Sequence, residues 1–361
     1  MMKIAILGAG NAGCSVAADL SLKGHEVFLI KTSKSMHDQN FEHIFHNGGK
    51  ISLLESGVRK DTKISLVTRD ISKISQVELI IVYVQTNYHE SLIRKIVPFL
   101  HQDQIILINP GYLSTAYFLK IDSNPNYILV EAESSFVDCR ILLPGLVRVG
   151  FRNVRNPLGV FPNKRKAEAK ECLKKVGYPF VYTDSVVEAG LHNPNLIVHT
   201  IGGIMSIPRI EKTNGNYYMY KEVFTPSVWK LLKALDNEKM DVLTALNLPR
   251  LSYPEACKFR NVLDDDKEAD EVFRWYASLP VLTKGPKVVD SRFITEDVPQ
   301  GLVLLESLGK YLKVSTPVTS SLIEIANACL ERDFRKSGRS LERLGYENLA
   351  RILEDGKNNK N

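Results

Sequence analysis

The sequence predicts an α/β Rossmann-type dinucleotide-binding domain followed by an all-α C-terminal domain. Three observations support this: short apolar runs alternate with helical patterns in the first half, a GxGxxG motif follows the first apolar run, and helical patterns dominate after about residue 183. Strands that alternate with helices form parallel βαβ units. Because 361 residues exceed one ordinary core, two domains are expected. We predict domains at 1–182 and 183–361.

Apolar runs mark the strands of the first domain. We predict strands at 3–7, 26–30, 77–84 and 105–109, helices at 12–23 and 164–176, and shorter strands between 128 and 160. The run at 77–84 is apolar at nearly every position, as in a strand covered on both faces.

Two Thr-Pro pairs predict helix starts in the second domain. Thr225-Pro226 and Thr316-Pro317 each place an N-cap residue before a first-turn proline. Apolar residues from Val228 to Leu246 recur with a 3.6-residue period, so this helix buries one face. The second helix is expected to bury Val318, Leu322, Ile325, Ala326 and Cys329.

Charge and cysteine usage exclude several classes of protein. The net charge of +6 is spread along the chain, unlike the basic arm or stripe of a nucleic-acid binder. The five cysteines are far apart without a CxxC pair, so we predict neither a disulfide framework nor a metal site. Gly8 interrupts the N-terminal apolar segment too early for a signal peptide or a membrane span. We expect a cytoplasmic protein.

The histidines at 46, 89, 101 and 192 fit no ligand spacing and are expected in loops or at the surface.

The glycine motif predicts a dinucleotide site. Gly8, Gly10 and Gly13, with Asn11 and Ala12 between them, stand between a predicted strand and a predicted helix. The first glycine permits the tight turn, the second leaves room for the diphosphate, and the third lets helix and strand approach. The N–H groups at the helix start then attract the diphosphate.

The end of the second strand favours NADP over NAD. NAD sites place Asp or Glu there, about 20 residues past the glycines, to bind the ribose. This chain instead continues with Lys31, Thr32, Ser33 and Lys34, which could hold a 2′-phosphate. The alternative is a polar loop whose lysines face water.

A histidine on a helix is the first catalytic candidate. Asn193 and Pro194 begin the predicted helix, and Asn195 and His199, four residues apart, project from one face. A histidine among aliphatic residues is more often a core residue than a catalyst, so the spacing alone leaves both readings open.

An arginine and an aspartate further along the chain are the second candidate. Arg292 and Asp297 stand five residues apart in a stretch that ends in Pro299 and Gly301. A carboxylate bonded to an imidazole fixes its tautomer, and a guanidinium binds a substrate carboxylate with two hydrogen bonds. The alternative is a local surface ion pair.

The second domain resembles the octopine/nopaline (opine) dehydrogenases. The resemblance is carried by HNPNLIVHTIGGIM at 192–205, YKEVFTPSVWKLLKALDNEK at 220–239, RFITEDVPQGLVLLESLG at 292–309, VSTPVTSSLIEIAN at 314–327 and DFRKSGRSLERLG at 333–345. It implies a Rossmann domain and a helical domain with the active site between them. His199 and Asp297 fall on the family's catalytic pair, and Arg292 falls on the arginine near the substrate carboxylate.

The resemblance also implies further residues and a reaction. Glu133 and Cys139 match residues that line the family's substrate site, and Asn109 stands in a loop beside the coenzyme; we add Asn195, on the face of His199, to the substrate site. The implied reaction is an NAD(P)H-dependent reductive condensation of an amino acid or amine with a 2-oxo acid such as pyruvate, through an imine. His199 would act as general acid, and Asp297 would orient it.

Two other functions remain open. A related two-domain dehydrogenase, of the ketopantoate reductase or glycerol-3-phosphate dehydrogenase type, would act on an oxo acid or alcohol, but those enzymes usually use a catalytic lysine, and no lysine stands in a comparable motif. A non-catalytic NADP-binding sensor would keep the glycines but not the trio of Arg292, His199 and Asp297. No pattern identifies the amine or the oligomeric state, and a homodimer is left open.

Overall fold

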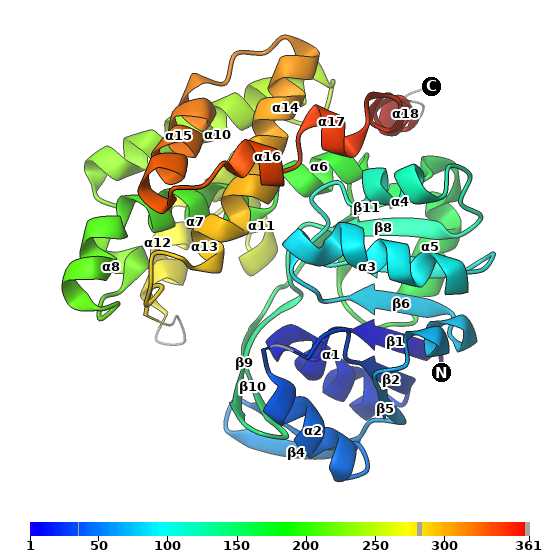
Figure 1. Cartoon of the computed structure of the whole chain (residues 1–361). Coiled ribbons are helices and arrows are strands. Elements are labelled where there is room, and N and C mark those ends of the chain that lie inside the picture. The colour runs from blue at the N-terminus through cyan, green and yellow to red at the C-terminus, as the bar shows by residue number, and fades with distance from the viewer. Residues whose placement is uncertain (35, 280–283, 358–361) are drawn as a thin grey trace. The chain divides into compact units, whose positions relative to one another are not determined.

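Strand β1 (Lys3–Leu7) lies inside the main sheet of the N-terminal unit. The computed structural model describes residues 1–34, 36–279 and 284–357. Within it the chain divides into two units, Met1–Val186 and Val187–Asn361 (Figure 1). The division follows residue 186, four residues after the boundary predicted from the sequence.

The N-terminal unit contains the strands and five α-helices. Its strands are β1 (Lys3–Leu7), β2 (Glu26–Ile30), β3 (Lys50–Glu55), β4 (Val58–Lys63), β5 (Leu66–Thr68), β6 (Leu79–Val82), β7 (Ile105–Ile108), β8 (Ile128–Ala132), β9 (Val137–Leu143), β10 (Leu146–Arg152), β11 (Asn156–Phe161) and β12 (Phe180–Tyr182). Its helices, as far as the structure describes them, are α1 (Asn11–Leu22), α2 (Asp38–His46), α3 (His89–Ile96), α4 (Thr115–Ile121) and α5 (Lys166–Lys174), with 3-10 turns η1 (Ile71–Gln76), η2 (Thr86–Tyr88), η3 (Val97–Phe99) and η4 (Asn163–Arg165).

The main sheet has the order β12-β11-β8-β7-β6-β1-β2-β5 over the described residues. Its pairs are parallel, except that β11 runs antiparallel to β8. Every residue of β6, β7 and β8 is buried, as an apolar strand covered on both faces requires. The predicted strands at 3–7, 26–30, 77–84 and 105–109 are β1, β2, β6 and β7, and the predicted α/β class is confirmed.

A second sheet, with the order β4-β3-β10-β9, was not predicted. The sequence of β4, VRKDTK, has no apolar alternation, and its residues are exposed or half-buried. β10 pairs in parallel with β3, about ninety residues earlier in the chain. β9 and β10 lie in the region from 128 to 160 where short strands were predicted, whereas β3 and β4 were not predicted, and the pairing of β10 with β3 joins residues far apart in the chain.

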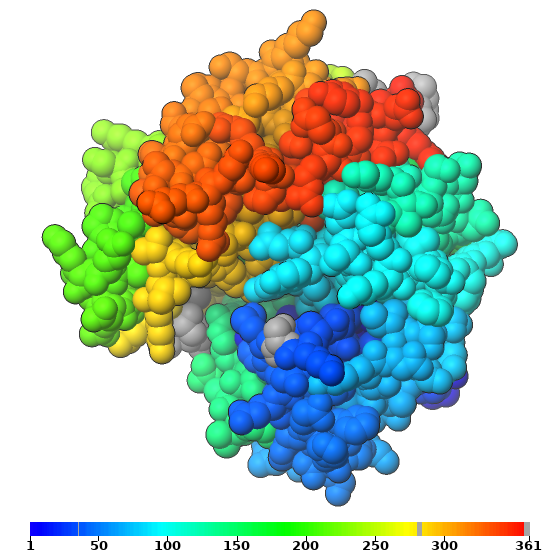
Figure 2. Space-filling view, in the orientation of Figure 1, coloured from blue at the N-terminus to red at the C-terminus, as the bar shows by residue number. Residues whose placement is uncertain are grey.

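The C-terminal unit is helical over its described residues. Its helices are α6 (Val186–Leu191), α7 (Pro194–Met205), α8 (Ile207–Thr213), α9 (Met219–Glu222), α10 (Pro226–Ala245), α11 (Tyr253–Asn261), α12 (Ala269–Ser278), α13 (Arg292–Thr295), the π-helix η5 (Val298–Leu302), α14 (Val303–Leu312), α15 (Pro317–Leu330), α16 (Phe334–Ser337), α17 (Leu341–Leu344) and α18 (Tyr346–Lys357). On the face shown in Figure 2, the orange and red segments form a large part of this unit's surface.

The helices at both Thr-Pro pairs form, but the predicted inner face of α15 is partly wrong. Ile325 is 42% exposed and Cys329 is exposed, whereas Thr319 and Ile323 are buried. Glu238 on α10 is a buried carboxylate that contacts the first turn of α15. It accepts hydrogen bonds from the N–H groups of Val318 and Thr319 and from the Thr319 hydroxyl, at 2.6–2.8 Å. These bonds hold Thr319 against α10, on the buried side of α15.

The predicted placement in loops or at the surface is wrong for His89; His192 lies in the turn between α6 and α7, as predicted, but is buried. His89 is buried at the start of α3, where its Nε2 contacts the Val84 carbonyl at 2.8 Å and its Nδ1 contacts the Ser114 hydroxyl at 2.6 Å. His192 is also buried, and burial lowers its pKa well below the usual value. Their neighbours come from other parts of the chain, which sequence spacing does not show.

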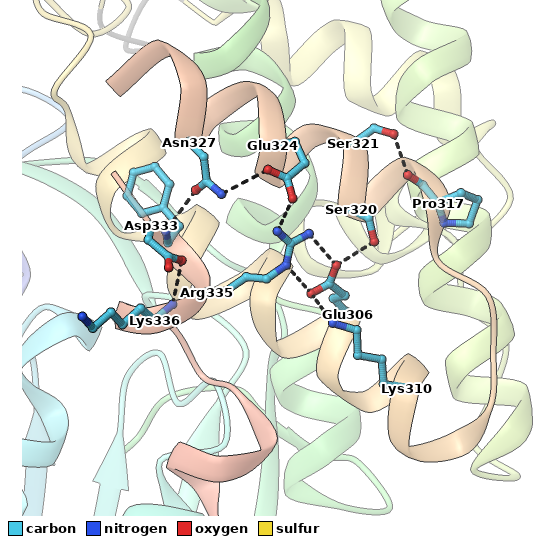
Figure 3. A network of polar contacts seen from close by, with 11 residues as sticks. Glu306, Lys310, Pro317, Ser320, Ser321, Glu324, Asn327, Asp333, Arg335 and Lys336 are labelled. Carbon is cyan, nitrogen blue, oxygen red and sulfur yellow. Dashed lines mark hydrogen bonds and ion pairs between the residues drawn. The ribbon is translucent and has the colours of Figure 1, made fainter. Parts of the chain in front are cut away.

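A buried carboxylate joins three helices of the C-terminal unit (Figure 3). Glu306 on α14 accepts two hydrogen bonds from Arg335 on α16, both at 2.7 Å, and one from Ser320 on α15 at 2.6 Å. Lys310 adds a fourth at 3.0 Å. Burial alone would raise the pKa of Glu306, but the bonds from Arg335 and Ser320 outweigh it and lower the pKa to about 2.

Glu306→Gln is expected to lower the free energy of unfolding by about 2–3 kcal/mol at pH 7. The folded-state pKa lies below the ordinary value of 4.5, so this stabilisation is present above about pH 4.5 and is lost as the pH falls toward 2. The difference between wild type and variant should therefore shrink from pH 6 to pH 3, as measured by urea denaturation. Glu324→Gln, which changes an exposed carboxylate on the same arginine, is the control. An equal loss for Glu306→Gln at both pH values would contradict the prediction.

No described helix combines the length and the apolar character needed to cross a membrane.

Candidate active site

The turn between β1 and α1 has the geometry of a dinucleotide-binding loop. Gly8 has a φ of +109°, which side chains rarely adopt. A methyl carbon on Gly13 would lie 1.8 Å from the Gly8 carbonyl oxygen, so only glycine permits this approach of helix and strand. On Gly10 the nearest described atom would be 3.6 Å away, in the ring of His37. The chain thus leaves Gly10 open, as the approach of a diphosphate requires.

Asn11 and Ala12 begin α1 directly after this turn. The Asn11 side chain accepts a hydrogen bond from the N–H of Ile141 at 2.8 Å. It therefore fastens β9 to the start of α1, a structural role that the sequence did not indicate. The backbone N–H groups of this first turn remain the groups that suit a diphosphate.

The residues after β2 differ from one another in exposure. Lys31 is 5% exposed, and its amine donates to the Met36 carbonyl, so the alternative that Lys31 faces water is wrong. Thr32 is half-buried and Ser33 is exposed. The Ser33 carbonyl accepts a hydrogen bond from Arg69 at 2.9 Å. Cationic groups therefore lie close to the end of β2, where the adenosine ribose of a dinucleotide lies in this fold.

Asn109 follows β7 at the same edge of the sheet as the glycine turn. Its Nδ2 donates to the Tyr83 hydroxyl at 3.1 Å. Its Oδ1 is buried and, over the described residues, has no hydrogen-bond partner. Buried acceptors are normally paired, so this oxygen fits a site that a ligand completes.

Glu133 and Cys139 are both buried in the N-terminal unit, 2% and 4% exposed. The N–H of Glu133 donates to the Pro157 carbonyl at 3.1 Å. Burial raises the pKa of the Cys139 thiol to about 12, so it stays protonated at neutral pH and is no nucleophile.

In the C-terminal unit, α7 positions two of the predicted site residues. The Asn193 side chain accepts from the N–H of Asn195 at 2.9 Å and caps the helix, with Pro194 in its first turn. Residues 196–198 and 200 are buried, whereas Asn195 and His199 are half-buried. The two side chains thus share the less buried stripe of the helix, as their spacing predicts.

The structure brings His199 and Asp297 together across 98 residues of chain. Nδ1 of His199 donates to Oδ2 of Asp297 at 2.9 Å, and their side chains are 12% and 2% exposed. A carboxylate bonded at Nδ1 fixes the proton there. Nε2 has no hydrogen-bond partner in the described parts of the chain, so it is free to hold or accept a proton.

Phe293 is a site residue that the sequence reasoning missed. Its ring lies flat on the His199 imidazole, with centroids 3.7 Å apart and planes 7° apart. Gly203, one turn after His199, permits this contact, because a methyl carbon there would lie 3.0 Å from Ile294 and 3.3 Å from Phe293. The available signal was an aromatic residue four positions before Asp297.

The backbone widens directly after Asp297. Val298–Leu302 forms a π-helix, a geometry frequent at functional sites. The buried Arg339 supports it: its N–H donates to the Pro299 carbonyl at 3.0 Å, and its Nε donates to the Gln300 side chain at 2.8 Å. Residues far along the chain therefore fix the segment that carries Asp297.

Arg292 does not pair with Asp297. Its side chain is 55% exposed, and its Nε lies 3.7 Å from Glu296, beyond normal hydrogen-bond length. The local ion pair considered for the two predicted residues is therefore absent, and the Arg292 guanidinium is only loosely held.

Phe293→Leu is expected to reduce kcat about tenfold or more while leaving coenzyme affinity unchanged, because the imidazole loses the flat ring that fixes its plane. Steady-state kinetics and coenzyme titration separate the two effects. Phe224→Leu, a half-buried phenylalanine of the same unit, is the matched control. An unchanged kcat in Phe293→Leu would show that the stack is dispensable.

Two family models match the chain. Residues 182–330 match the model described as "NAD/NADP octopine/nopaline dehydrogenase, alpha-helical domain". Residues 4–113 match the model described as "Ketopantoate reductase PanE/ApbA".

The chain is also similar to named relatives over nearly its whole length. It is 27% identical to an opine dehydrogenase of Arthrobacter sp. (strain 1C), covering 96% of each chain. It is 23% identical to a vitopine synthase of Allorhizobium ampelinum, covering 98% of this chain and 99% of the relative.

Two solved structures share its fold. Octopine dehydrogenase with NADH and L-arginine gives a TM-score of 0.78 at 16% identity, with 98% of each chain covered. NADP+-bound yersinopine dehydrogenase gives 0.73 at 15% identity, with 99% of each covered.

The helical unit, the glycine turn and the full-length relatives lead to one conclusion. This chain is an NAD(P)-dependent oxidoreductase whose residues 182–330 match the helical domain of the octopine/nopaline dehydrogenases.

Proposed function

We propose that this chain reductively condenses an amino acid or amine with a 2-oxo acid such as pyruvate, and that it prefers NADPH to NADH. The 2.9 Å contact between His199 and Asp297 carries the proposal. It supplies an oriented imidazole with a free Nε2, which a proton-transfer step needs. Named relatives with opine and vitopine activities support the substrate class.

The reaction has two stages that balance without a further reagent. The amine nitrogen adds to the 2-oxo carbon, water leaves, and an imine forms. When bound, the nicotinamide supplies a hydride to the imine carbon, and with one proton the product is a secondary amine.

The described residues have distinct parts in this proposal. His199 holds a proton at Nε2 beside the 2-oxo oxygen and favours its loss as water. Asp297 keeps the imidazole protonated at Nδ1 and oriented. The exposed guanidinium of Arg292 binds a substrate carboxylate with two hydrogen bonds. Asn195 contributes a polar group to the same half-buried face of α7.

Residues of the N-terminal unit hold the coenzyme. The glycine turn would take the diphosphate on the open side of Gly10, and the unpaired Oδ1 of Asn109 would accept a hydrogen bond from the coenzyme. The buried ammonium of Lys31, with Thr32 and Ser33, favours a 2′-phosphate over a free ribose hydroxyl. Glu133 and Cys139 belong to the substrate-binding part of the proposal. Because the reaction draws on cellular NADPH, the proposal places the protein in the cytoplasm.

Coenzyme oxidation with a substrate panel tests the reaction. NADPH consumption should require both pyruvate and an amino acid, and mass spectrometry should find the secondary amine. Turnover with pyruvate or ketopantoate alone would instead favour a simple oxo-acid reductase, which the model matched by residues 4–113 makes the second candidate. Tight NADPH binding without turnover on any substrate pair would favour a sensor.

A further inference from the structure

We infer that His37 is a second contact for the 2′-phosphate of NADP(H), beside Lys31, and that it makes NADPH binding take up a proton. The inference rests on the coenzyme preference proposed above. No motif in the sequence marks His37, because it lies beyond the residues where specificity is normally read. Its place in the fold gives the first argument.

His37 lies at the open side of the glycine turn. The ring carbon Cδ2 of His37 is 3.6 Å from where a methyl carbon on Gly10 would stand, and apart from Gly10 and its two chain neighbours no other described atom comes within 4 Å of that point. In this fold the adenosine ribose lies between the second glycine and the end of the second strand. The imidazole of His37 therefore borders the space in which the ribose and its 2′-substituent are bound.

The backbone holds His37 in this place. Its φ of 62° is left-handed, a conformation that is uncommon for a residue other than glycine and concentrates at functional sites. The Lys31 amine donates to the carbonyl of Met36, the preceding residue, and α2 begins at Asp38, the following one. The Lys31 ammonium thus holds the turn that carries His37 against the end of β2. The side chains of Lys31 and His37 are therefore close together.

The charges around His37 favour an anion. Lys31, after β2, is the charged group that acts on it most directly. Asp38, at the start of α2, and Glu42, one turn later, both bind Arg69 after β5, at 2.7 and 2.6 Å, and this arginine neutralises much of their charge. The ring of His37 makes no hydrogen bond to the described residues, so its two nitrogens are available to a ligand.

Proton uptake follows from this environment. Burial, followed by the charge of Lys31, lowers the pKa of His37 below its usual value, so the ring is neutral in the free protein at neutral pH. A phosphate dianion in contact with the ring would favour the charged form and raise that pKa. NADPH should therefore bind together with a proton, whereas NADH, which lacks the 2′-phosphate, should not.

Binding measurements without substrate test the inference. Calorimetry between pH 6.5 and 8.5, in buffers of different ionisation enthalpy, gives both Kd and the number of protons taken up. For the wild type we expect NADPH and adenosine 2′,5′-bisphosphate to bind with proton uptake, and the Kd of NADPH to fall about tenfold toward pH 6.5, the effect of one pKa unit at one site. NADH should show little of either effect.

Two variants and a control give the decisive comparison. His37→Gln should abolish most of the proton uptake with NADPH while leaving NADH affinity unchanged, and the titration of the phosphate itself cancels in this comparison. Lys31→Met should weaken NADPH at every pH. His101→Gln, at an exposed histidine of the same unit, should behave as wild type.

Two results would overturn the inference. Unchanged proton uptake in His37→Gln would place the ring away from the coenzyme. An equal effect on NADH and NADPH would mean that the ring meets the diphosphate and not the 2′-phosphate. Neither result depends on turnover, so failure of the amino-acid panel and failure of this binding test are distinguishable.

Discussion

His199→Gln is expected to lower kcat by about 10²–10⁴-fold while the Kd of NADPH stays at the wild-type value. The size follows from the loss of a positioned proton donor and acceptor. The glutamine can still donate to Asp297, so the contact seen at Nδ1 is partly kept and the fold is spared. Stopped-flow or steady-state oxidation of NADPH measures kcat, and calorimetric titration measures Kd.

Asp297→Asn shows whether the two residues act as one unit. An asparagine oxygen accepts the same hydrogen bond but no longer stabilises a charged imidazole. We expect a loss comparable to that of His199→Gln, and a double variant hardly worse than either single one, because residues that act together are not additive. If the fold-losses in kcat of the two single variants multiply in the double variant, the two side chains act independently. Full activity in His199→Gln would remove the histidine from the mechanism.

Gly13→Ala and Gly10→Ala are expected to separate folding from coenzyme binding. A methyl carbon on Gly13 would lie 1.8 Å from the Gly8 carbonyl, which is incompatible with the present backbone, so we expect a loss of about 3 kcal/mol or more in the free energy of unfolding. On Gly10 the nearest atom would be 3.6 Å away, an ordinary contact. Gly10→Ala should therefore unfold like the wild type but bind NADPH about tenfold more weakly or worse.

Urea denaturation and coenzyme titration, applied to both variants, check this pair. Wild-type NADPH affinity in Gly10→Ala would mean that the diphosphate does not pass over Gly10, and the coenzyme site would then lie elsewhere.

The main sheet could be predicted because its strands carry their own signal. β1, β6 and β7 are apolar runs whose residues are nearly all buried, and burial on both faces is visible in the local sequence. The sheet β4-β3-β10-β9 was missed because β4 is charged and exposed, and because β3 and β10 pair over a long distance. The inner face of α15 was misjudged because Thr319, a polar residue, is buried by its bonds to Glu238 on another helix, and the sequence of α15 does not show this partner.

In the candidate site, too, local features could be predicted from the sequence and contacts between distant residues could not. The cap at Asn193 and the spacing of Asn195 and His199 are local, and the structure has them as the sequence suggested. The contact of His199 with Asp297 was predicted from the family resemblance alone, because periodicity cannot relate two residues so far apart in the chain. Phe293 was missed because its contact depends on the absence of a side chain at Gly203.

The support that Arg339 gives to the π-helix after Asp297 bears on synthesis of the chain. A nascent polypeptide emerging from the ribosome presents Asp297 some forty residues before Arg339. Until Arg339 has emerged, the π-helix lacks the hydrogen bonds that Arg339 donates to Pro299 and Gln300. Asp297 is then not held in position against the His199 imidazole. A fragment that stops at residue 330 would contain His199 and Asp297 and still be inactive, so we expect competence for catalysis to arise only after Arg339 has been synthesised.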